Sequence, residues 1–306
     1  MRLLTRSDFD GLGCAALLRE KGIVDNYKFV HPKDIQDNLV EVTSDDVMAN
    51  IPYVQGCGLW FDHHTSEDSR LNIEELDFEG NFEIAPSAAQ VVWDYYDGEK
   101  GFKAHFLPLL EAVNKTDSAD LNREEVLNAE GWILISFVMD PRTGLGRFKD
   151  YRISNYQLML DMIEYCRTKS VEEILEIPDV KERTSRYHEQ QDLYVEMLKK
   201  CCTVDGNVII TNLLNEDTIY CGNRFLVYAQ FAEQNIEVRV MWGKDKQNIV
   251  FTCGHSIMSQ TSGTDVGKLM LKYNGGGHEK VGTCQVPIAN WEDDLKAIVS
   301  KMKEDG

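Results

Sequence analysis

Segments with the pattern of buried strands recur along the first part of the chain and are separated by polar, glycine-containing stretches. Strands are predicted at 3–6, 27–30 and 58–61, the last as a continuous apolar run that is typical of a buried strand. Helices are predicted at 14–20, 85–96 and 102–113, from apolar stretches and helix-start signals. Strands that alternate with helices indicate an α/β domain.

The second half of the chain has a different order of elements and predicts a separate domain. The polar segment 180–198 has a helical composition and is our candidate for the connection between domains. Strands are predicted after it at 207–211, 237–242 and 248–253, with helices at 223–233 and 265–273. We therefore expect a first domain over 1–180, a linker helix over 181–202 and a smaller second domain over 203–306.

The charge balance narrows the class of ligand. The chain has 306 residues, 43% of them hydrophobic and 27% charged, and a net charge of −19. An acidic surface without a run of basic residues repels long nucleic acid, so we expect no duplex DNA partner. Bound cations can reverse the local field, which favours a small anionic substrate.

The sequence also bears on the cellular compartment. It contains no run of about 18 apolar residues, so we expect no membrane span. The predicted first strand begins at once and leaves no room for a signal peptide, which favours the cytoplasm. The eight cysteines include no Cys-x-x-Cys pair, so a disulfide scaffold or structural zinc site is not expected.

Asp62, His63 and His64 stand at the end of the strand predicted at 58–61. Ligands of open α/β sheets bind just beyond the carboxyl ends of the strands, so these side chains suit a metal or phosphate site. Successive side chains of an extended chain point to opposite sides, which predicts different roles for the two histidines. The alternative is that one of them is an ordinary core or surface residue.

Aspartates follow other predicted elements too. Asp8 and Asp10 lie in the glycine-containing turn after the first strand and can reach one hard cation together. A helix cap would explain either of them but not both. Asp117 stands just beyond the helix at 102–113, where a plain cap is the alternative. Asp45 or Asp46 would complete a cation site, and the sequence barely separates them.

Two glycine-rich segments suit an anion. Gly275, Gly276 and Gly277 precede His278, and three successive glycines cost backbone entropy, so the loop needs a reason to carry them. Close approach of backbone amides to an anion is the usual reason, and a tight turn is the alternative. The basic turn 142–147 either contacts a substrate phosphate or is a surface loop.

These motifs together resemble the DHH superfamily of phosphoesterases. The resemblance rests on Asp8-x-Asp10-Gly11, on Asp62-His63-His64 and on Gly275-Gly276-Gly277-His278, in this order over nearly the whole chain. The last motif resembles the DHH-associated C-terminal domain, and the nearest relatives look like exopolyphosphatase-related and nanoribonuclease-like proteins. The resemblance implies an α/β fold with a parallel-sheet DHH domain and a smaller α/β domain with a mixed sheet.

The resemblance also implies a site with two metal ions, Mn²⁺ by expectation and Mg²⁺ as the alternative. The metal ligands that it implies are Asp8, Asp10, Asp46 (with Asp45 as second choice), His63 and Asp117. The catalytic residues that it implies are His64, which would face the scissile phosphate, and Asp62, which would support the site. The substrate-binding residues would be Gly275, Gly276, Gly277 and His278.

The chain departs from this family pattern at two places. Relatives often carry a histidine just upstream of the first aspartate, where this chain has Leu4, Arg6 and Ser7, and this leaves open whether one or two metal ions bind. Relatives also often carry an arginine in the segment matching 256–260, which has none here. Arg224 or Lys280 would be the substitute for substrate binding.

The expected function is metal-dependent hydrolysis of small phosphodiesters or phosphomonoesters of nucleotides. Phe225 and Tyr273 are candidates for stacking on a base. The alternatives are exopolyphosphatase or pyrophosphatase activity on inorganic chains, and a non-catalytic nucleotide sensor. The expected partner is a small phosphate compound, with no membrane contact, and a homodimer is left open.

Overall fold

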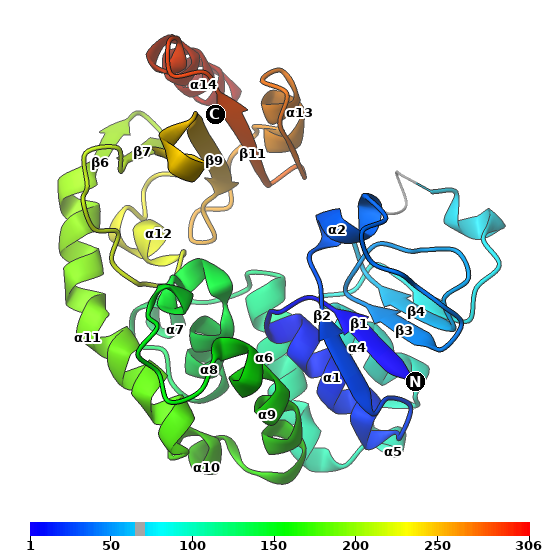
Figure 1. Cartoon of the computed structure of the whole chain (residues 1–306). Coiled ribbons are helices and arrows are strands. Elements are labelled where there is room, and N and C mark those ends of the chain that lie inside the picture. The colour runs from blue at the N-terminus through cyan, green and yellow to red at the C-terminus, as the bar shows by residue number, and fades with distance from the viewer. Residues whose placement is uncertain (65–70) are drawn as a thin grey trace. The chain divides into compact units, whose positions relative to one another are not determined.

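The structure is a computed structural model that describes residues 1–64 and 71–306, and it contains two compact units. The first unit combines Met1–Leu121 with Ala129–Tyr187, and the second combines Asn122–Asn128 with His188–Gly306. Helix α11 (Pro178–Cys201) runs from the first unit into the second (Figure 1). The boundary after Tyr187 falls inside the segment predicted as a linker, whereas the sequence did not indicate that 122–128 joins the second unit.

A parallel sheet organises the first unit. Its order is β2 (Asn26–Phe29), β1 (Arg2–Thr5), β3 (Asp46–Ala49), β4 (Leu59–Asp62) and β5 (Gly80–Phe82). Strands β1, β2 and β4 lie where the pattern predicted strands, while β3 and β5 were not assigned from it. The register aligns Thr5 with Ala49 and Ala49 with Phe61. The carboxyl ends of β1, β3 and β4 therefore lie at one level, where a site is expected.

Apolar rows cover both faces of this sheet. Leu4, Met48 and Trp60 are neighbours in register, are wholly buried and form one apolar cluster. Phe61 points to the other face, where its ring lies 5.1 Å from that of Tyr95 in α4. Because successive residues of a strand point to opposite faces, one short strand supplies both layers of the core.

Helices of the first unit pack around α1. The longer helices are α1 (Phe9–Glu20), α4 (Ala88–Tyr95), α6 (Leu107–Asp117), α8 (Gly131–Met139) and α9 (Asn155–Thr168). The shorter ones are α2 (Pro32–Gln36), α5 (Gly98–Gly101), α10 (Val171–Leu175) and the 3₁₀ turns η1 (Ile73–Glu75), η2 (Ala104–Phe106), η3 (Pro141–Thr143) and η4 (Leu145–Arg147). Helix α1 contacts α4, α6 and α9, so it lies at the centre of this layer.

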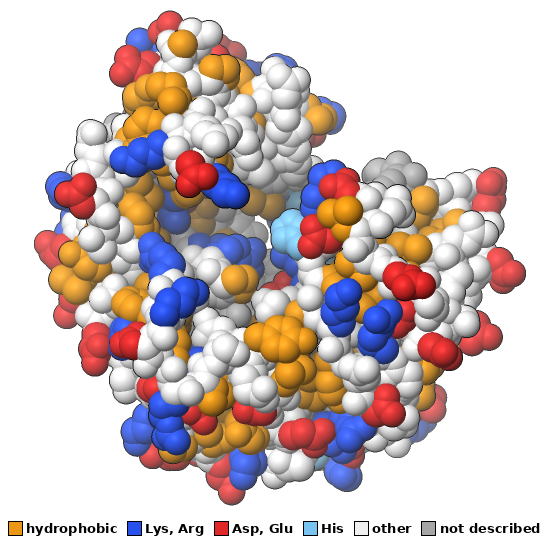
Figure 2. All heavy atoms as spheres, in the orientation of Figure 1, with side chains coloured by type: hydrophobic (Ala, Val, Ile, Leu, Met, Phe, Trp, Pro, Cys, Tyr) orange, Lys and Arg blue, Asp and Glu red, His pale blue; other side chains and the backbone are white. Residues whose placement is uncertain are grey.

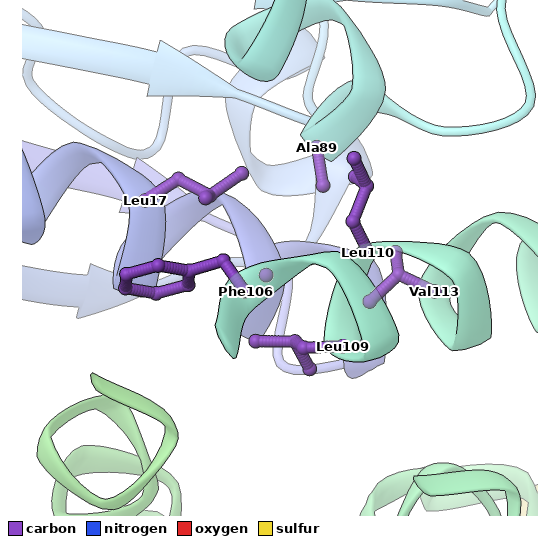
Figure 3. A pocket seen from close by; sticks show the side chains of 7 residues that line it. Leu17, Ala89, Phe106, Leu109, Leu110 and Val113 are labelled. Atoms are coloured by element: carbon purple, nitrogen blue, oxygen red, sulfur yellow. The ribbon is translucent and has the colours of Figure 1, made fainter. Parts of the chain in front are cut away.

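The contact between α1, α4 and α6 encloses a small apolar recess (Figure 3). Leu17, Phe106, Leu109 and Val113 line it together with Gly13, and it has no room for a water molecule. A Cβ atom on Gly13 would lie 3.1 Å from the Cβ atom of Ala89, so the glycine lets the helices approach closely. The recess is a feature of core packing.

The second unit contains a mixed sheet. Its order is β10 (Gly276–Gly277), β11 (Val281–Val286), β9 (Ile249–His255), β8 (Ile236–Trp242), β7 (Val208–Asn212) and β6 (Cys202–Asp205), and only β7 and β8 are parallel neighbours. Its helices are α7 (Arg123–Leu127), α12 (Leu226–Gln230), α13 (Val266–Leu271) and α14 (Trp291–Asp305), with the 3₁₀ turn η5 (Lys244–Lys246). The two-domain α/β fold with one parallel and one mixed sheet is thus confirmed.

Surface and cysteine chemistry agree with the composition. Lys and Arg side chains lie among Asp and Glu side chains on the face drawn in Figure 2. All eight cysteines are free, and most are buried. In the described ranges, no helix combines the length and apolar character that a membrane crossing needs.

Candidate active site

Asp8 caps helix α1. Its Oδ1 atom accepts a hydrogen bond from the backbone N–H of Gly11 at 3.0 Å, and the helix therefore begins at Phe9, earlier than predicted. The acidic segment read as a turn is the first turn of this helix. A Cβ atom on Gly11 would lie 2.1 Å from the carbonyl oxygen of Arg6, so only glycine allows the strand and helix to meet here.

Asp10, in the same helical turn, is held by the N-terminus of α4. Its carboxylate accepts hydrogen bonds from the backbone N–H groups of Ala88 at 3.0 Å and Ala89 at 2.8 Å, and it is 2% exposed. Burial and the charges of Asp117 and Asp8 nevertheless raise the pKa of Asp10 well above its ordinary value. The site therefore holds more negative charge than its own donors offset, as expected where a cation binds.

Asp62 ends strand β4 and organises the residues after it. Its Oδ1 atom accepts the backbone N–H of His63 at 2.9 Å and lies 2.6 Å from Nδ1 of His64. The two imidazole centroids are 4.4 Å apart, so the expectation that the histidines point to opposite sides is wrong. The strand ends at Asp62, and the alternation of side chains ends with it.

The Asp62 carboxylate also sets the charge of His64. Burial alone would lower the pKa of His64, but the hydrogen bond and charge of Asp62 outweigh it and raise the pKa to about 9. His64 is therefore protonated at neutral pH, with Nδ1–H donated to Asp62 and Nε2–H available as a second donor.

His63 offers a bare nitrogen to two carboxylates. Its Nδ1 atom lies 3.0 Å from the carbonyl oxygen of Ala85, which only accepts, so Nδ1 carries a proton and Nε2 is the nitrogen left for a cation. Nε2 lies 3.3 Å from Oδ2 of Asp117 and 3.8 Å from Oδ2 of Asp10. Counting the described residues, this buried atom has no hydrogen-bond partner. Asp10, His63 and Asp117, the metal triad, therefore fit a divalent cation.

Asp117 is the last residue of α6, and a chain of side chains ties its helix to the support of Asp10. The Ser87 hydroxyl, which caps α4, donates to Oδ1 of Asn114 at 2.6 Å. The Nδ2 group of Asn114 donates to Gln90 at 2.7 Å. The Asp117 side chain is 31% exposed, so the metal triad is open to solvent on this side.

The structure contradicts the assignment of Asp46 as a metal ligand. Asp46 begins β3 opposite Arg2, and its two carboxylate oxygens lie 2.6 and 2.9 Å from the Arg2 guanidinium. A strand rises about 3.3 Å per residue, which puts Asp46 about 10 Å from Ala49 at the carboxyl end of β3. Asp45 lies at the same amino-terminal edge, where its carbonyl accepts from the Arg2 N–H, so the second choice is wrong as well.

Asn50, and neither Asp45 nor Asp46, lies beside the carboxyl end of β3. It follows the end of β3, is 1% exposed, and its Nδ2 group donates to Oδ1 of Asp8 at 3.0 Å. The sequence feature that could have identified Asn50 is the apolar run 47–49, which is followed directly by this polar residue. In the same way, the apolar run 59–61 is followed directly by Asp62. Because its side chain is an amide, a pattern of carboxylates does not include Asn50.

Two arginines bring positive charge to the site. The Nε atom of Arg6 lies 3.1 Å from Oδ2 of Asp8. Arg142, in η3, contacts the Asp140 carboxylate at 2.8 and 3.1 Å. Burial would lower the pKa of Arg142, but the charges of Asp140, Asp8 and Asp117 outweigh it and hold that pKa above its ordinary value. The basic turn thus contributes charge to the site.

The chain is 46% identical to a pGpG-specific phosphodiesterase, PggH, from Vibrio cholerae, with a TM-score of 0.86. The comparison covers 100% of this chain and 99% of that one. A DHH-domain protein described as a member of the s1p family of ribosomal proteins shares the fold at 13% identity, with a TM-score of 0.56 over 99% of this chain and 86% of that one. The chain belongs to the DHH superfamily of phosphoesterases.

Another DHH-type structure is more distant. RecJ from Thermus thermophilus in complex with Mg²⁺ is 12% identical, with a TM-score of 0.51 over 99% of this chain and 49% of that one. At this identity the likeness concerns the fold alone. No protein-family model and no curated protein matches the chain.

The glycines of the DHH-associated motif are largely explained by the β10–β11 pairing. A Cβ atom on Gly275 would lie 2.2 Å from the carbonyl oxygen of Thr283, and one on Gly277 would lie 2.2 Å from that of Val281. A Cβ atom on Gly276 would meet nothing within 4 Å. Close approach of the β11 backbone therefore accounts for two of the three glycines, and phosphate binding by this loop and His278 stays a prediction.

The other residues predicted to bind substrate also lie in the second unit. The Arg224 guanidinium lies 4.3 Å from the ring centroid of Phe225. Phe225 is only 5% exposed, and Tyr273 packs against the apolar core of this unit. Phe225 therefore has no open face for a base. Tyr273 is half-buried, so its stacking on a base and the role of Arg224 stay predictions.

Proposed function

We propose that the protein is a metal-dependent phosphodiesterase that hydrolyses short guanine dinucleotides of the pGpG type. The observation that carries this proposal is the 46% identity, over the whole chain, to a phosphodiesterase specific for pGpG. The metal triad and the Asp62–His64 pair supply the donor and acceptor groups that such a reaction needs. Water would add across the bridging P–O bond, and pGpG would give two guanosine monophosphates.

The metal triad has the donor set of a hard divalent cation. Two carboxylates and one neutral imidazole suit Mn²⁺ or Mg²⁺, and the Ala85 carbonyl fixes the His63 tautomer that such binding requires. When bound, the cation would lower the pKa of a water molecule and offset charge on the phosphate. We propose Mn²⁺ as the working ion and Mg²⁺ as the alternative.

The residues beside the metal triad have separable roles in this proposal. Asp62 orients His64 through the 2.6 Å contact and keeps it protonated. The Nε2–H group of His64 would then donate to a phosphoryl oxygen or to the leaving oxygen. Arg6 and Arg142 add positive charge at the site, so a protein with a net charge of −19 can still bind a dinucleotide.

The test is product release from a panel of phosphate compounds in the presence of Mn²⁺. The panel is pGpG, pApA, a cyclic dinucleotide, pyrophosphate and short polyphosphate. We expect guanosine monophosphate from pGpG, with much slower release from the other compounds. Two matched variants accompany the wild type: His64→Ala should bind Mn²⁺ but lose turnover, and His63→Ala should lose both.

Other outcomes would replace the proposal. Release from pyrophosphate or polyphosphate alone would make the protein an inorganic phosphohydrolase. An Mn²⁺-bound wild type that leaves all five compounds intact would favour the non-catalytic sensor. Equal rates on pGpG and pApA would keep the reaction class and remove the guanine preference.

A further inference from the structure

The partners of Asp8 bear on how many cations the site holds. The family resemblance implies two, and a second one needs ligands beyond the metal triad. Asp8 is the obvious candidate, because it lies beside Asp10 in sequence and is 8% exposed. Its carboxylate is already occupied by donors of the chain itself.

Two hydrogen-bond donors and one guanidinium group surround the Asp8 carboxylate. Its Oδ1 atom accepts from the N–H of Gly11 at 3.0 Å and from Nδ2 of Asn50 at 3.0 Å. Its Oδ2 atom faces Nε of Arg6 at 3.1 Å. Both oxygens are therefore engaged, one of them by a permanent positive charge, and a cation would have to displace these donors.

Within residues 1–64 and 71–306, this part of the site lacks the remaining ligands of a second cation. Asn50, a neutral amide, occupies the carboxyl end of β3, and the carboxylate of Asp46 lies at the other end of that strand. Leu4 is wholly buried in the apolar cluster with Met48 and Trp60. Among the described residues, β3 therefore offers no bridging carboxylate beside Asp8, and β1 offers no imidazole to a second cation.

The described residues contain two groups of three acidic or histidine side chains that lie close enough to share one cation, and these groups also indicate a single metal ion. They are Asp10, His63 and Asp117, and Asp62, His63 and His64, and neither includes Asp8. The second cluster shares His63 with the first, and its Nδ1–Oδ1 contact of 2.6 Å between His64 and Asp62 leaves no space for an ion between them. It is a hydrogen-bonded pair beside the metal triad.

We propose that the site holds one divalent cation, on the metal triad, and that the Arg6 guanidinium supplies the second positive charge. Nε of Arg6 lies 3.1 Å from Oδ2 of Asp8, and the Arg6 side chain is 36% exposed. Of the carboxylates in residues 1–64 and 71–306, Asp8 is its one ion-pair partner. The outer N–H groups of the planar guanidinium can then bind phosphoryl oxygens in pairs. Arginine would thus supply the positive charge that a second cation would otherwise provide. This inference rests on the proposed phosphodiester substrate.

The first test counts ions without using activity. Wild-type protein is dialysed to equilibrium against excess Mn²⁺, and bound metal is measured per chain by elemental analysis. We expect one ion for the wild type, one for Asp8→Asn and none for His63→Ala. Two ions in the wild type, with one lost in Asp8→Asn, would overturn the proposal.

The second test concerns Arg6 itself. Arg6→Ala should still bind one Mn²⁺, and its kcat/KM for pGpG should fall about 100-fold, the scale of losing a preorganised donor. Arg6→Lys, which keeps the charge but not the fork, should fall less, and added guanidinium ion should restore part of the Arg6→Ala activity. An Arg6→Ala variant with unchanged kcat/KM would contradict the role of the guanidinium.

The two proposals fail differently. A wild-type protein that binds one Mn²⁺ but does not hydrolyse pGpG contradicts the proposed substrate and leaves the ion count standing. A protein that hydrolyses pGpG with two bound ions supports the substrate and contradicts the single-cation site.

Discussion

The Nδ1 atom of His64 lies 2.6 Å from Oδ1 of Asp62, and this contact separates the work of two neighbouring histidines. His64 is held protonated by Asp62, whereas His63 donates to the Ala85 carbonyl and turns a bare nitrogen toward the metal triad. The Asp-His-His sequence thus contains a charged donor and a metal ligand side by side. The roles depend on different partners, so they can be tested one at a time.

Asp62→Asn should change the pH dependence of turnover. In the wild type the pKa of His64 is about 9, so the protonated donor persists across neutral pH and is lost as the pH rises through that value. Without the Asp62 charge the pKa should fall toward the ordinary histidine value of about 6.5. We expect the alkaline limb of the kcat profile to move to lower pH and kcat at pH 8 to fall about 10- to 100-fold.

The control for this variant is metal content. Asp62→Asn keeps Asp10, His63 and Asp117, so Mn²⁺ bound per chain should not change. A pH–rate profile identical to that of the wild type would show that the proton on His64 has no part in the rate.

Removal of the metal should lower the thermal stability of the first unit. A ligand at 100 times its dissociation constant stabilises the folded state by about 2.7 kcal/mol. For a unit of this size that corresponds to a rise in Tm of about 5–10 °C, reversed by a chelator. Differential scanning calorimetry with and without Mn²⁺ measures it. His63→Ala should show no shift, and a shift as large as that of the wild type would place the ion elsewhere.

Asp46→Asn should reduce stability while leaving metal binding and turnover intact. Asp46 is 1% exposed and pairs with Arg2, and its other donors are the N–H and hydroxyl of Thr43. Removing the charge from such a group costs about 2 kcal/mol of unfolding free energy, measured by urea unfolding at pH 7. A loss of bound Mn²⁺ in this variant would restore the original assignment of Asp46.

The pH dependence of that loss has a definite sign. Burial opposes ionisation, but the Arg2 and Thr43 contacts outweigh it and lower the pKa of Asp46 below its ordinary value. The stabilisation is therefore fully present above the unfolded pKa of about 3.9 and is lost as the pH falls through the lower folded value. The difference between wild type and Asp46→Asn should be constant from pH 6 to 8 and shrink only in acid.

Local pattern predicted the parts of the site that follow a strand directly. Asp62 directly follows the run 58–61, and the two-residue spacing of Asp8 and Asp10 puts one at the N-cap and the other in the first turn of α1. Asp46 was misplaced because β3 begins at that residue instead of ending there, and only the register with β1 reveals this. Asn50 was not assigned because its importance depends on a hydrogen bond to Asp8, 42 residues away in the chain. Arg6 was not assigned because its importance depends on the side-chain contact with Asp8.

The order of elements was predicted better than their ends. Helix α12 covers only Leu226–Gln230 of the predicted 223–233, and α1 begins five residues before the predicted start at 14 because Asp8 caps it. Such ends depend on single hydrogen bonds, which periodicity does not report. The segment 122–128 joins the second unit through the Asn223 side chain, which donates to the Val126 carbonyl, again a contact between distant residues.

Gly275 and Gly276 of the DHH-associated motif should differ in their tolerance of a substitution by alanine. At Gly275 a new Cβ atom would lie 2.2 Å from the Thr283 carbonyl, so the β10–β11 pairing must separate, whereas at Gly276 it would meet nothing within 4 Å. We expect Gly275→Ala to destabilise the second unit by at least about 2 kcal/mol and Gly276→Ala to stay within about 0.5 kcal/mol of the wild type. Urea unfolding of both variants, with the first unit followed separately by its Mn²⁺-dependent Tm, makes the comparison.

If Gly276→Ala unfolds like the wild type but its KM for pGpG rises, the loop binds substrate as well. If both variants are equally stable, the hairpin does not require the glycine, and the anion-binding reason for the motif regains its weight.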